Sequence, residues 1–588
     1  MRRNRLKALV KSRAVAFLVM LLAVSPAINL TQTAAGSPVG IPVATQTDIV
    51  GPPGSGRFGT SVTALPNGNI VITDPTYSTG GPTPVANVGA VYLYNGATGA
   101  MISMLTGSNA NDRVGMTGVT VLSSGNYVVR SSVWNGGSGA VTWGSSTAGV
   151  SGVVSAANSL VGSTTEDSVG NLPITELTNG NYVVRTPTWH NVGATLAGAV
   201  TWGSGTAGVS GTISAANSLV GDKPFDEVGT QSVTALANGN YVVSSPNWAN
   251  GGSSRVGAVT WGNGATGTSG IVSPSNSLVG STEFDSVGVR GVTALTNGNY
   301  VVSSPVWDNG AVSTAGAATW GNGATGTVGV VSAANSLVGG LNDLVSLNGV
   351  TALANGNYVV ITSGWRNGAD SGAGAVTWGN GATGTSGLVS AANSLVGGMP
   401  QDFIGIGGVT ALTNGNYVVR SPGWNVNAGA ATWGNGATGT SGVVSAANSL
   451  VGTTAFDRVS FDGITALANG NYVVSSASWN GFRGAVTWGN GTTGISGMIT
   501  AANSLFGGTL SDQVGVLGVT ALANGNYVVR SPFWDNGGAV DAGAATWGNG
   551  AAGTTGVVSA ANSLVGSASQ DRIGNGSLTA LTNGNYVV

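Results

Sequence analysis

The chain has 588 residues, of which 7% are charged, 42% are hydrophobic and none is cysteine. The hydrophobic fraction can build a large core, and the lack of cysteine excludes disulfides, thiol catalysis and cysteine metal sites. Six of the 19 basic residues lie in the first 13 positions, so the rest of the chain holds 13 basic and 21 acidic residues. A net charge of about −8 without a basic stripe argues against a nucleic-acid-binding protein.

The first 35 residues have the pattern of a secretory signal peptide. Basic residues precede the apolar run Ala14–Val24, and Thr33-Ala34-Ala35 is a suitable cleavage site. The apolar run of 11 residues is too short to span a bilayer, and no later segment is long and apolar enough. We therefore expect a signal peptide over 1–35, a linker over 36–49, and a mature chain without a membrane span. Such a protein would be secreted, on the cell surface or in the periplasm.

Internal repetition dominates residues 50–588. A word close to Asn-Gly-Asn-Tyr-Val-Val recurs every 55 to 59 residues, which defines nine full repeats and part of a tenth. We number the repeats 1 to 10 by the glycines of this word: Gly68, Gly125, Gly180, Gly239, Gly298, Gly356, Gly415, Gly470, Gly525 and Gly584.

Each repeat is expected to contain four short strands and no helix. In repeat 4 these strands are expected at 233–236, 240–246, 257–261 and 270–280, which are rich in Val, Thr, Tyr and Trp and bounded by Gly and Asn. The Asn-Gly pair between the first two strands predicts a tight hairpin in which both turn residues have positive φ. No segment shows a 3.6-residue period, so we expect an all-β chain.

The loop between the second and third strands varies in length. All 16 tryptophans form eight pairs at two fixed places in the repeat, from Trp134/Trp143 to Trp534/Trp547. The members of a pair are 9 residues apart in three repeats and 13 apart in five. Lengthening a hairpin loop leaves both strands in phase, whereas a slip within a strand would reverse its faces. This loop is therefore predicted to face solvent.

Four antiparallel strands in each tandem repeat are typical of β-propeller blades. The alternative is a β-solenoid, whose coils stack without hairpins; two turn signals in each repeat favour blades. Nine full repeats and part of a tenth exceed the four to eight blades of a usual propeller. The sequence is therefore interpreted either as a piece of a longer array or as one ring followed by part of a second.

Repeat 1 carries a family resemblance in Arg57–Val62, Asn67–Asn69 and Gly89–Tyr94. These segments resemble the FG-GAP blade of integrin-α-type propellers, in which Phe-Gly is followed by an acidic calcium loop and a Gly-Ala-Val-Tyr strand. Repeats 2 to 9 resemble an uncharacterised tandem repeat of bacterial exported proteins, some of which are labelled haemagglutinin-like. The resemblance implies propeller blades over about residues 50–588.

The calcium loop of the FG-GAP family is altered in this chain. Calcium takes six to eight oxygen ligands, usually including carboxylates. The matching stretch Leu522–Asn526 has no acidic residue, and no other repeat has one inside this loop. We expect no calcium, no other metal and no cofactor.

One aspartate recurs in each repeat, one residue before Val-Gly or a variant of it. A ring of such carboxylates could hold cations or a polar ligand. The position at a turn instead favours an Asx-type turn, in which the carboxylate accepts hydrogen bonds from backbone N–H groups. The residues are Asp112, Asp167, Asp226, Asp285, Asp343, Asp402, Asp457, Asp512 and Asp571.

The paired tryptophans and the only histidine have structural and functional interpretations. The tryptophans could stack on sugars, but aromatic residues at fixed strand positions more often pack between blades. His190 could be a catalytic base, but no nucleophile or orienting carboxylate is identifiable beside it. We therefore expect packing tryptophans and an exposed histidine in a loop.

Recognition usually resides in variable loops on a rigid scaffold. The candidate binding residues are His190, Asn191, Arg255, Asp308, Arg366, Asp370, Arg483, Asp535 and Asp541. We expect an exported, non-enzymatic protein of the bacterial surface that adheres to, or binds, an unknown protein or glycan. The alternatives are a passive spacer in a larger surface protein and, less favoured, a propeller enzyme. An enzyme is less favoured because near-identical blades offer almost no singular polar groups.

Overall fold

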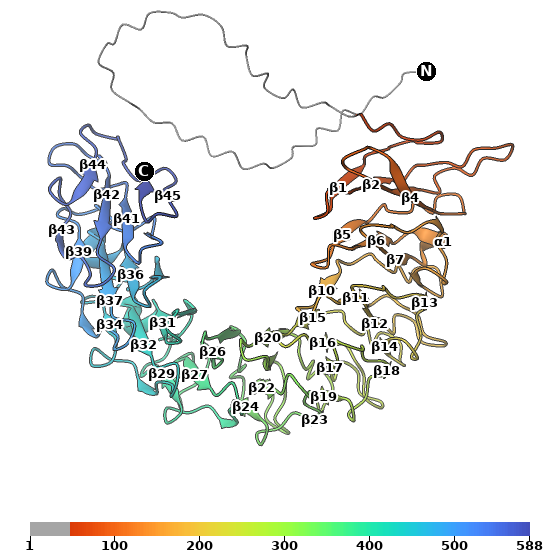
Figure 1. Cartoon of the computed structure of the whole chain (residues 1–588). Coiled ribbons are helices and arrows are strands. Elements are labelled where there is room, and N and C mark those ends of the chain that lie inside the picture. Colours follow the sequence, from red (N-terminus) through yellow and green to blue (C-terminus); the bar gives the residue numbers. More distant parts are fainter. Residues whose placement is uncertain (1–47) are drawn as a thin grey trace, which may run out of the picture.

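The computed structural model describes residues 48–588, so the expected signal peptide and nearly all of the expected linker lie outside the described residues. The sheets follow one another along one open arc, with the first and last sheets at its two ends (Figure 1). Within residues 48–588 no helix has the length and apolarity needed to cross a bilayer. The expected all-β fold is confirmed, and repeats 1 to 9 each have the four expected antiparallel strands, to which a fifth strand is added in repeats 1 to 8.

The first strand of each repeat lies on the inner side of the arc and pairs with the second (Figure 1). The first strands are β1 (Ser61–Ala64), β5 (Gly118–Val121), β10 (Thr175–Glu176), β15 (Ser232–Ala235), β20 (Val292–Ala294), β25 (Val350–Ala352), β30 (Val409–Ala411), β35 (Gly463–Ala466), β40 (Val519–Ala521) and β45 (Thr579–Ala580). The second strands are β2 (Ile70–Asp74), β6 (Tyr127–Ser131), β11 (Tyr182–Thr186), β16 (Tyr241–Ser245), β21 (Tyr300–Ser304), β26 (Tyr358–Thr362), β31 (Tyr417–Ser421), β36 (Tyr472–Ser476), β41 (Tyr527–Ser531) and β46 (Tyr586–Val587).

The third and fourth strands continue each antiparallel sheet toward the outer side. The third strands are β3 (Ala90–Tyr94), β7 (Ala140–Gly144), β12 (Ala199–Gly203), β17 (Ala258–Gly262), β22 (Ala317–Gly321), β27 (Ala375–Gly379), β32 (Ala430–Gly434), β37 (Ala485–Gly489) and β42 (Ala544–Gly548). The fourth strands are β4 (Met101–Thr106), β9 (Leu160–Val161), β14 (Leu219–Val220), β19 (Ser277–Val279), β24 (Ser336–Val338), β29 (Ser394–Val396), β34 (Leu450–Val451), β39 (Ser504–Phe506) and β44 (Ser563–Val565).

The segment 270–280 was expected to form one strand, but it forms two strands that belong to different sheets. Residues Gly270–Ile271 pair in parallel with the fourth strand of repeat 3, whereas Ser277–Val279 pair with the third strand of repeat 4. Asn276 forms the turn between them, because its side chain donates to the Ile271 carbonyl and accepts from Ser273 N–H. The first two residues of each such segment therefore form a fifth strand at the edge of the preceding repeat's sheet. The fifth strands are β8 (Gly152–Val153), β13 (Gly211–Thr212), β18 (Gly270–Ile271), β23 (Gly329–Val330), β28 (Gly387–Leu388), β33 (Gly442–Val443), β38 (Gly497–Met498) and β43 (Gly556–Val557).

The hydrophobic core is divided into clusters, most of them lying between two neighbouring sheets. In the cluster between repeats 4 and 5, Val242 and Val259 of one sheet meet Tyr300, Val302 and Trp307 of the next. Alternate residues of a strand face opposite sides, so successive residues of the second strand serve the clusters on either side of their own sheet. Burial between adjacent repeats, with no single central core, is the pattern of a quasi-one-dimensional array.

The Asn-Gly-Asn word forms a hairpin turn of a different type from the one predicted. In repeat 1, Gly68 N–H donates to the Leu65 carbonyl and Leu65 N–H donates to the Asn69 carbonyl, which closes a three-residue loop. Gly68 has φ of 87°, and Asn67 is not among the residues of positive φ. The loop is a type I turn followed by one left-handed residue, so only the glycine needs positive φ.

Loop length is explained by two local conformations. In the three short loops the residues after the first tryptophan form a single turn: α1 (Trp134–Gly137), α2 (Trp424–Asn427) and α3 (Trp479–Phe482). In each long loop an asparagine pairs with the residue three positions later, as Asn250 does with Ser253. Both conformations return the chain to the third strand in register, as the sequence predicted.

Burial of the repeated tyrosine predicts alkaline unfolding. Burial raises the pKa of Tyr241, Tyr300 and Tyr358 to about 12, from an ordinary value of about 10. The folded state therefore keeps these protons when the unfolded state has lost them, and stability is full below pH 10 and falls between pH 10 and 12. We expect each tyrosine to contribute roughly 1–3 kcal/mol of this loss. Urea denaturation from pH 8 to 12 measures this loss of stability. Tyr241→Phe should weaken the dependence of the free energy of unfolding on pH, and an unchanged dependence would contradict tyrosine burial as its cause.

Candidate functional site

The two ends of the sheets differ in sequence. One end, the turn end, is made of the Asn-Gly-Asn turns and of the loops that follow each third strand in the chain and lead to the two-residue strand paired with the preceding repeat. The other, the loop end, is made of the variable loops and of the linkers that join the fourth strand of one repeat to the first strand of the next. No turn or loop of repeats 1 to 10 at the turn end contains a charged residue, whereas the linkers and variable loops contain many. The loop end is therefore where repeats differ chemically.

The recurring aspartate holds each linker to the variable loop that follows it. Asp285 is fully buried; its Oδ2 accepts from Ser281 N–H at 2.6 Å and Thr282 N–H at 2.8 Å, and its Oδ1 accepts from Asp308 N–H at 2.9 Å. The bond to the residue 23 positions later recurs in eight repeats, from Asp112 to Asp512. Loops of different sequence thus begin at the same fixed point.

These carboxylates are occupied by backbone donors. A carboxylate has about four lone-pair sites. Asp285 has five donors within hydrogen-bond distance, three backbone N–H groups and two hydroxyls, so no site is left for another ligand. Burial raises the pKa of Asp226 and Asp343, and the N–H donors act against that rise. Asp571, in the last linker, is exposed and accepts from Ser567 and Ala568 N–H. No group of three His, Asp or Glu suited to a metal occurs among residues 48–588.

His190 has the orienting carboxylate that the sequence did not reveal. Its Nδ1 lies 2.9 Å from Asp167 Oδ1, and its backbone N–H donates to the same oxygen. The side chain is 18% exposed, so it is not the freely exposed loop residue that was expected. The signal that could have found this contact is the 23-residue spacing between each aspartate and the residue after the first tryptophan.

Some of the other candidate loop residues have exposed side chains, and others form hydrogen bonds with the backbone. Arg255 and Arg366 are exposed, whereas Asp370 is half-buried. Asn191 donates to the Gly221 carbonyl, and Arg483 donates to the Gly508 carbonyl.

The aspartates of these loops form hydrogen bonds or ion pairs with nearby residues of the loop end. Asp308 and Asp535 accept from Thr314 and Asp541 N–H respectively, and Asp541 pairs with Arg572 at 3.1 Å. The structure therefore spreads the candidate residues over several loops and does not gather them into one site.

The two tryptophans of a pair have different environments. The first, such as Trp134 or Trp534, is buried in the cluster between two sheets. The second is half-buried, and its indole N–H donates to a carbonyl of the next repeat, as Trp143 does to Gly205 at 3.1 Å. Trp547, in repeat 9, is 43% exposed. In repeats 2 to 8 the second tryptophan donates this hydrogen bond and the first is buried or partly buried, so these pairs pack between repeats.

The Asn-Gly-Asn word also joins neighbouring repeats, which the sequence did not predict. Asn238 and Asn240 of repeat 4 both donate their side-chain N–H to the Gly323 carbonyl of repeat 5, at 2.8 and 2.9 Å. Trp261 Nε1 donates to the same oxygen at 2.9 Å. Equivalent asparagine bonds occur from repeat 1 to repeat 8. In repeat 9, Asn524 donates instead to the Gly584 carbonyl in the turn of repeat 10. We call this set of bonds the inter-repeat amide contact.

The loop end exposes large apolar side chains beside its charges. Each of the following is at least 42% exposed: Met116, Val192, Phe225, Phe284, Leu341, Met399, Ile406, Val426, Phe456, Phe461, Phe482, Leu510 and Val540. Phe225, Phe284 and Phe456 directly precede the recurring aspartate and have φ between 64° and 69°. The residue at this position has positive φ in all nine linkers, so the left-handed turn is part of the repeat, and the three rings stand where other repeats have Asn, Glu, Gln or Ser. These rings are the strongest sign of a binding surface.

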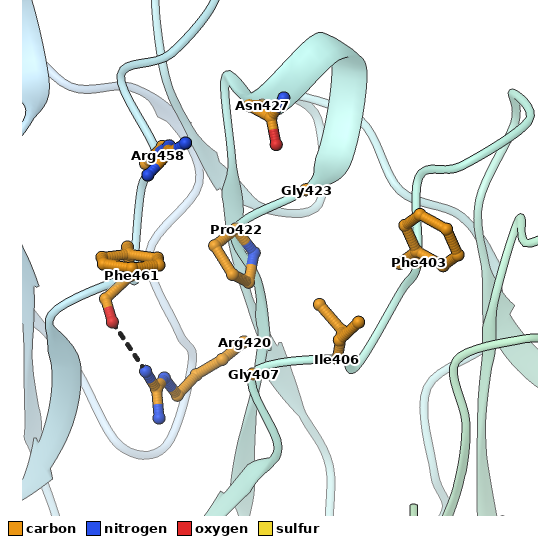
Figure 2. Close-up of a pocket in the computed structure, with 9 residues that line it drawn as sticks. All are labelled: Phe403, Ile406, Gly407, Arg420, Pro422, Gly423, Asn427, Arg458 and Phe461. Atoms are coloured by element: carbon orange, nitrogen blue, oxygen red, sulfur yellow. Dashed lines mark hydrogen bonds between the residues drawn. The ribbon is translucent and has the colours of Figure 1, made fainter.

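A pocket of about 400 Å³ opens between the linkers on either side of repeat 7. Figure 2 shows Arg458, Phe461 and Arg420 on one side of Pro422, and Phe403 and Ile406 on the other. The remaining lining residues are Gly407, Gly423 and Asn427. The volume lies in the range of small-ligand sites.

Two arginines give this pocket its charge. Arg420 donates to the Ser460 and Phe461 carbonyls, and burial lowers its pKa. The Arg458 guanidinium lies 5.3 Å from the centre of the Phe461 ring, and its side chain donates no hydrogen bond within residues 48–588. Asp402 and Asp457 point their carboxylates at backbone N–H groups. The charged lining of the pocket is therefore basic.

The repeat matches one described family over most of the chain. The family is described as "Repeat of unknown function (DUF5650)" and matches nine times, at 64–116, 121–171, 176–230, 235–289, 294–345, 352–406, 411–461, 466–516 and 521–575. The chain belongs to the DUF5650 repeat family. One DUF5650 repeat runs from the end of a first strand to the linker residues that follow the recurring aspartate. The first match, 64–116, lies over repeat 1, so repeat 1 is a DUF5650 repeat as well.

Comparisons with other proteins give low identity. No curated protein matches the chain. A structure described as streptogramin B lyase is 10% identical, with 63% of this chain and 92% of that chain covered and a TM-score of 0.23. BamB from Moraxella catarrhalis is 13% identical, with 71% of this chain and 93% of that chain covered and a TM-score of 0.23.

Proposed function

We propose that this chain is an exported, non-enzymatic DUF5650 array that binds a partner protein through its loop end. The observation that carries the proposal is the exposure of Phe225, Phe284 and Phe456, at 60%, 57% and 59%, in left-handed linker positions. Exposed apolar residues beside charged ones are typical of protein-interaction sites, and aromatic residues and arginine often dominate their binding energy.

The chemistry of the loop end favours a protein over a glycan. A sugar platform needs open aromatic faces with polar side chains beside them. The second tryptophans of repeats 2 to 8 are half-buried between repeats, and the buried recurring aspartates accept hydrogen bonds from backbone donors. Phenylalanine, leucine and valine side chains instead suit the apolar centre of a protein interface.

The resemblance to FG-GAP blades and to haemagglutinin-like exported proteins supports adhesion at a cell surface or in the periplasm. The expected signal peptide at 1–35 supports the same location. A non-enzymatic role is proposed because the repeats are near copies, whereas a catalytic site needs singular polar groups. The saturated carboxylates support this view.

A binding screen with matched variants tests the proposal. Fluorescent chain would be applied to purified exported proteins and to a glycan array, and each hit measured again with Phe225, Phe284 and Phe456 changed to serine. We expect a protein hit whose affinity falls at least tenfold in this variant, because apolar anchors are lost. The matched control changes Ile271, Val330 and Val443, which are 47–49% exposed on the fifth strands, to serine.

The control should bind as the parent does. Binding that survives the phenylalanine changes and falls in the control would overturn the loop end as the interface. Glycan hits alone would replace the protein partner with a glycan, and a chain that binds nothing in either panel would favour a passive spacer.

A further inference from the structure

The pocket beside repeat 7 combines features that no other described linker pair shares. The residue after the recurring aspartate is Phe403 in one linker and Arg458 in the next, and three positions further on are Ile406 and Phe461. Repeat 7 also has an arginine, Arg420, at the end of its second strand. An apolar wall and two guanidinium groups therefore face one cavity (Figure 2).

Arg458 is positioned to bind a carboxylate. The Phe461 ring supports one face of its guanidinium, which leaves the N–H edge without an acceptor in the described chain. Guanidinium and carboxylate form paired, charge-assisted hydrogen bonds, and a guanidinium stacked on an aromatic ring loses less conformational freedom on binding. Asp462 interacts electrostatically with both arginines of the pocket, but its carboxylate forms no hydrogen bond with either of them in the described part of the chain and accepts from Ala477 N–H at 2.6 Å.

The opposite wall is suited to an apolar side chain. Ile406 is 49% exposed and lines this side of the cavity with Phe403 and Pro422. Covering such apolar surface removes it from water, which favours binding. One ligand that meets both walls needs an apolar group and a carboxylate a few atoms apart.

We infer that this pocket holds an acidic, hydrophobic segment of a partner polypeptide, with an apolar side chain against Phe403, Ile406 and Pro422 and a neighbouring carboxylate on Arg458. The inference rests on the proposed protein-binding function and names the chemistry of the partner. Charge complementarity selects an acidic segment, because the charged lining residues are both arginines. Arg420 positions the Phe461 carbonyl and backbone, and Arg458 contacts the partner.

Short peptides of defined charge test this inference. The probes are N-acetyl-aspartyl-phenylalaninamide, its asparaginyl and lysyl analogues, and N-acetyl-aspartyl-alaninamide, each titrated into the full chain by ligand-observed NMR at low salt. The aspartyl-phenylalanine probe should bind at least threefold more tightly than each of the other three. Raising the salt should reduce that preference, because salt screens the attraction between the probe carboxylate and the guanidinium.

Variants separate the site from a general effect on the fold. Arg458→Ala should lower affinity for the aspartyl-phenylalanine probe to that of the asparaginyl analogue, and Arg458→Lys should keep part of it. Arg113→Ala is the matched control, since Arg113 occupies the same position after Asp112 in another linker. It should leave binding unchanged, and thermal melting of each variant checks its fold.

Equal binding of all four probes, tighter binding of the lysyl probe, or no effect of Arg458→Ala would each overturn the inference. The proposed function would survive these results if a protein hit still depended on Phe225, Phe284 and Phe456. Conversely, probe binding at Arg458 without any protein hit would keep the pocket chemistry and reject the broader interface.

Discussion

Replacing Asp285 by alanine is expected to lower the free energy of unfolding by about 3–5 kcal/mol. The carboxylate is fully buried and accepts hydrogen bonds from three backbone N–H groups, of Ser281, Thr282 and Asp308. Alanine would leave these donors without partners, and each unsatisfied buried donor costs about 1–3 kcal/mol. The loss is large because one side chain fixes both a linker and the start of a variable loop.

Urea denaturation followed by tryptophan fluorescence measures the change, and hydrogen exchange locates it. The amide protons of Ser281, Thr282 and Asp308 should exchange faster in Asp285→Ala than in the parent. Asp285→Asn should lower the free energy of unfolding by less, because asparagine keeps one acceptor oxygen. Asp571→Ala is the control, since Asp571 is exposed and should give a much smaller effect. Equal losses at Asp285 and Asp571 would contradict the importance of burial.

Under the proposed binding function, we expect the same contact to affect recognition as well as stability. A loop that starts from a bonded residue loses less conformational entropy when it binds a partner. Because the bond uses the backbone N–H of the residue after the tryptophan, that residue can be His190, Asp308, Arg366 or Asp535 without loss of the contact. Constant attachment with variable side chains is the arrangement expected of a binding scaffold.

Local sequence signals predicted the strands and the variable loops well. Valine-, threonine- and tyrosine-rich segments bounded by glycine became strands, and the four-residue difference in loop length fell between strands two and three. The segment 270–280 was only partly predicted, because its residues are equally suited to two sheets. Which half joins the preceding repeat depends on the turn made by Asn276, a tertiary outcome that strand propensity does not encode.

Contacts between repeats were beyond the local signals. The Asn-Gly-Asn word was predicted as a turn, but its side chains act 83 to 85 residues away, on the Gly323 carbonyl. Likewise, the Asp167 contact with His190 and the pocket at Arg458 arise where separate linkers and loops meet. A repeat sequence shows which residues recur, but the partner of a recurring residue depends on how adjacent repeats stack.

Changing Asn238 and Asn240 together to aspartate is expected to divide the array into two units that unfold separately. Both amides donate to the Gly323 carbonyl, and aspartate would place two carboxylates against that oxygen instead. Two lost hydrogen bonds and the new repulsion should cost about 2–4 kcal/mol at the interface of repeats 4 and 5. In a one-dimensional array, cooperativity is carried by such nearest-neighbour interfaces.

Calorimetry should therefore show one main transition for the parent and two for the variant, with the repeats on either side of the altered interface melting at different temperatures. The matched control is the same pair of changes at Asn583 and Asn585 of repeat 10, whose side chains donate no equivalent bond within residues 48–588. A single, unshifted transition in the Asn238/Asn240 variant would show that apolar burial between sheets couples the repeats without the amide contact. Two transitions would instead mean that the most constant word in the sequence is kept for coupling between repeats, while the loop end is free to vary.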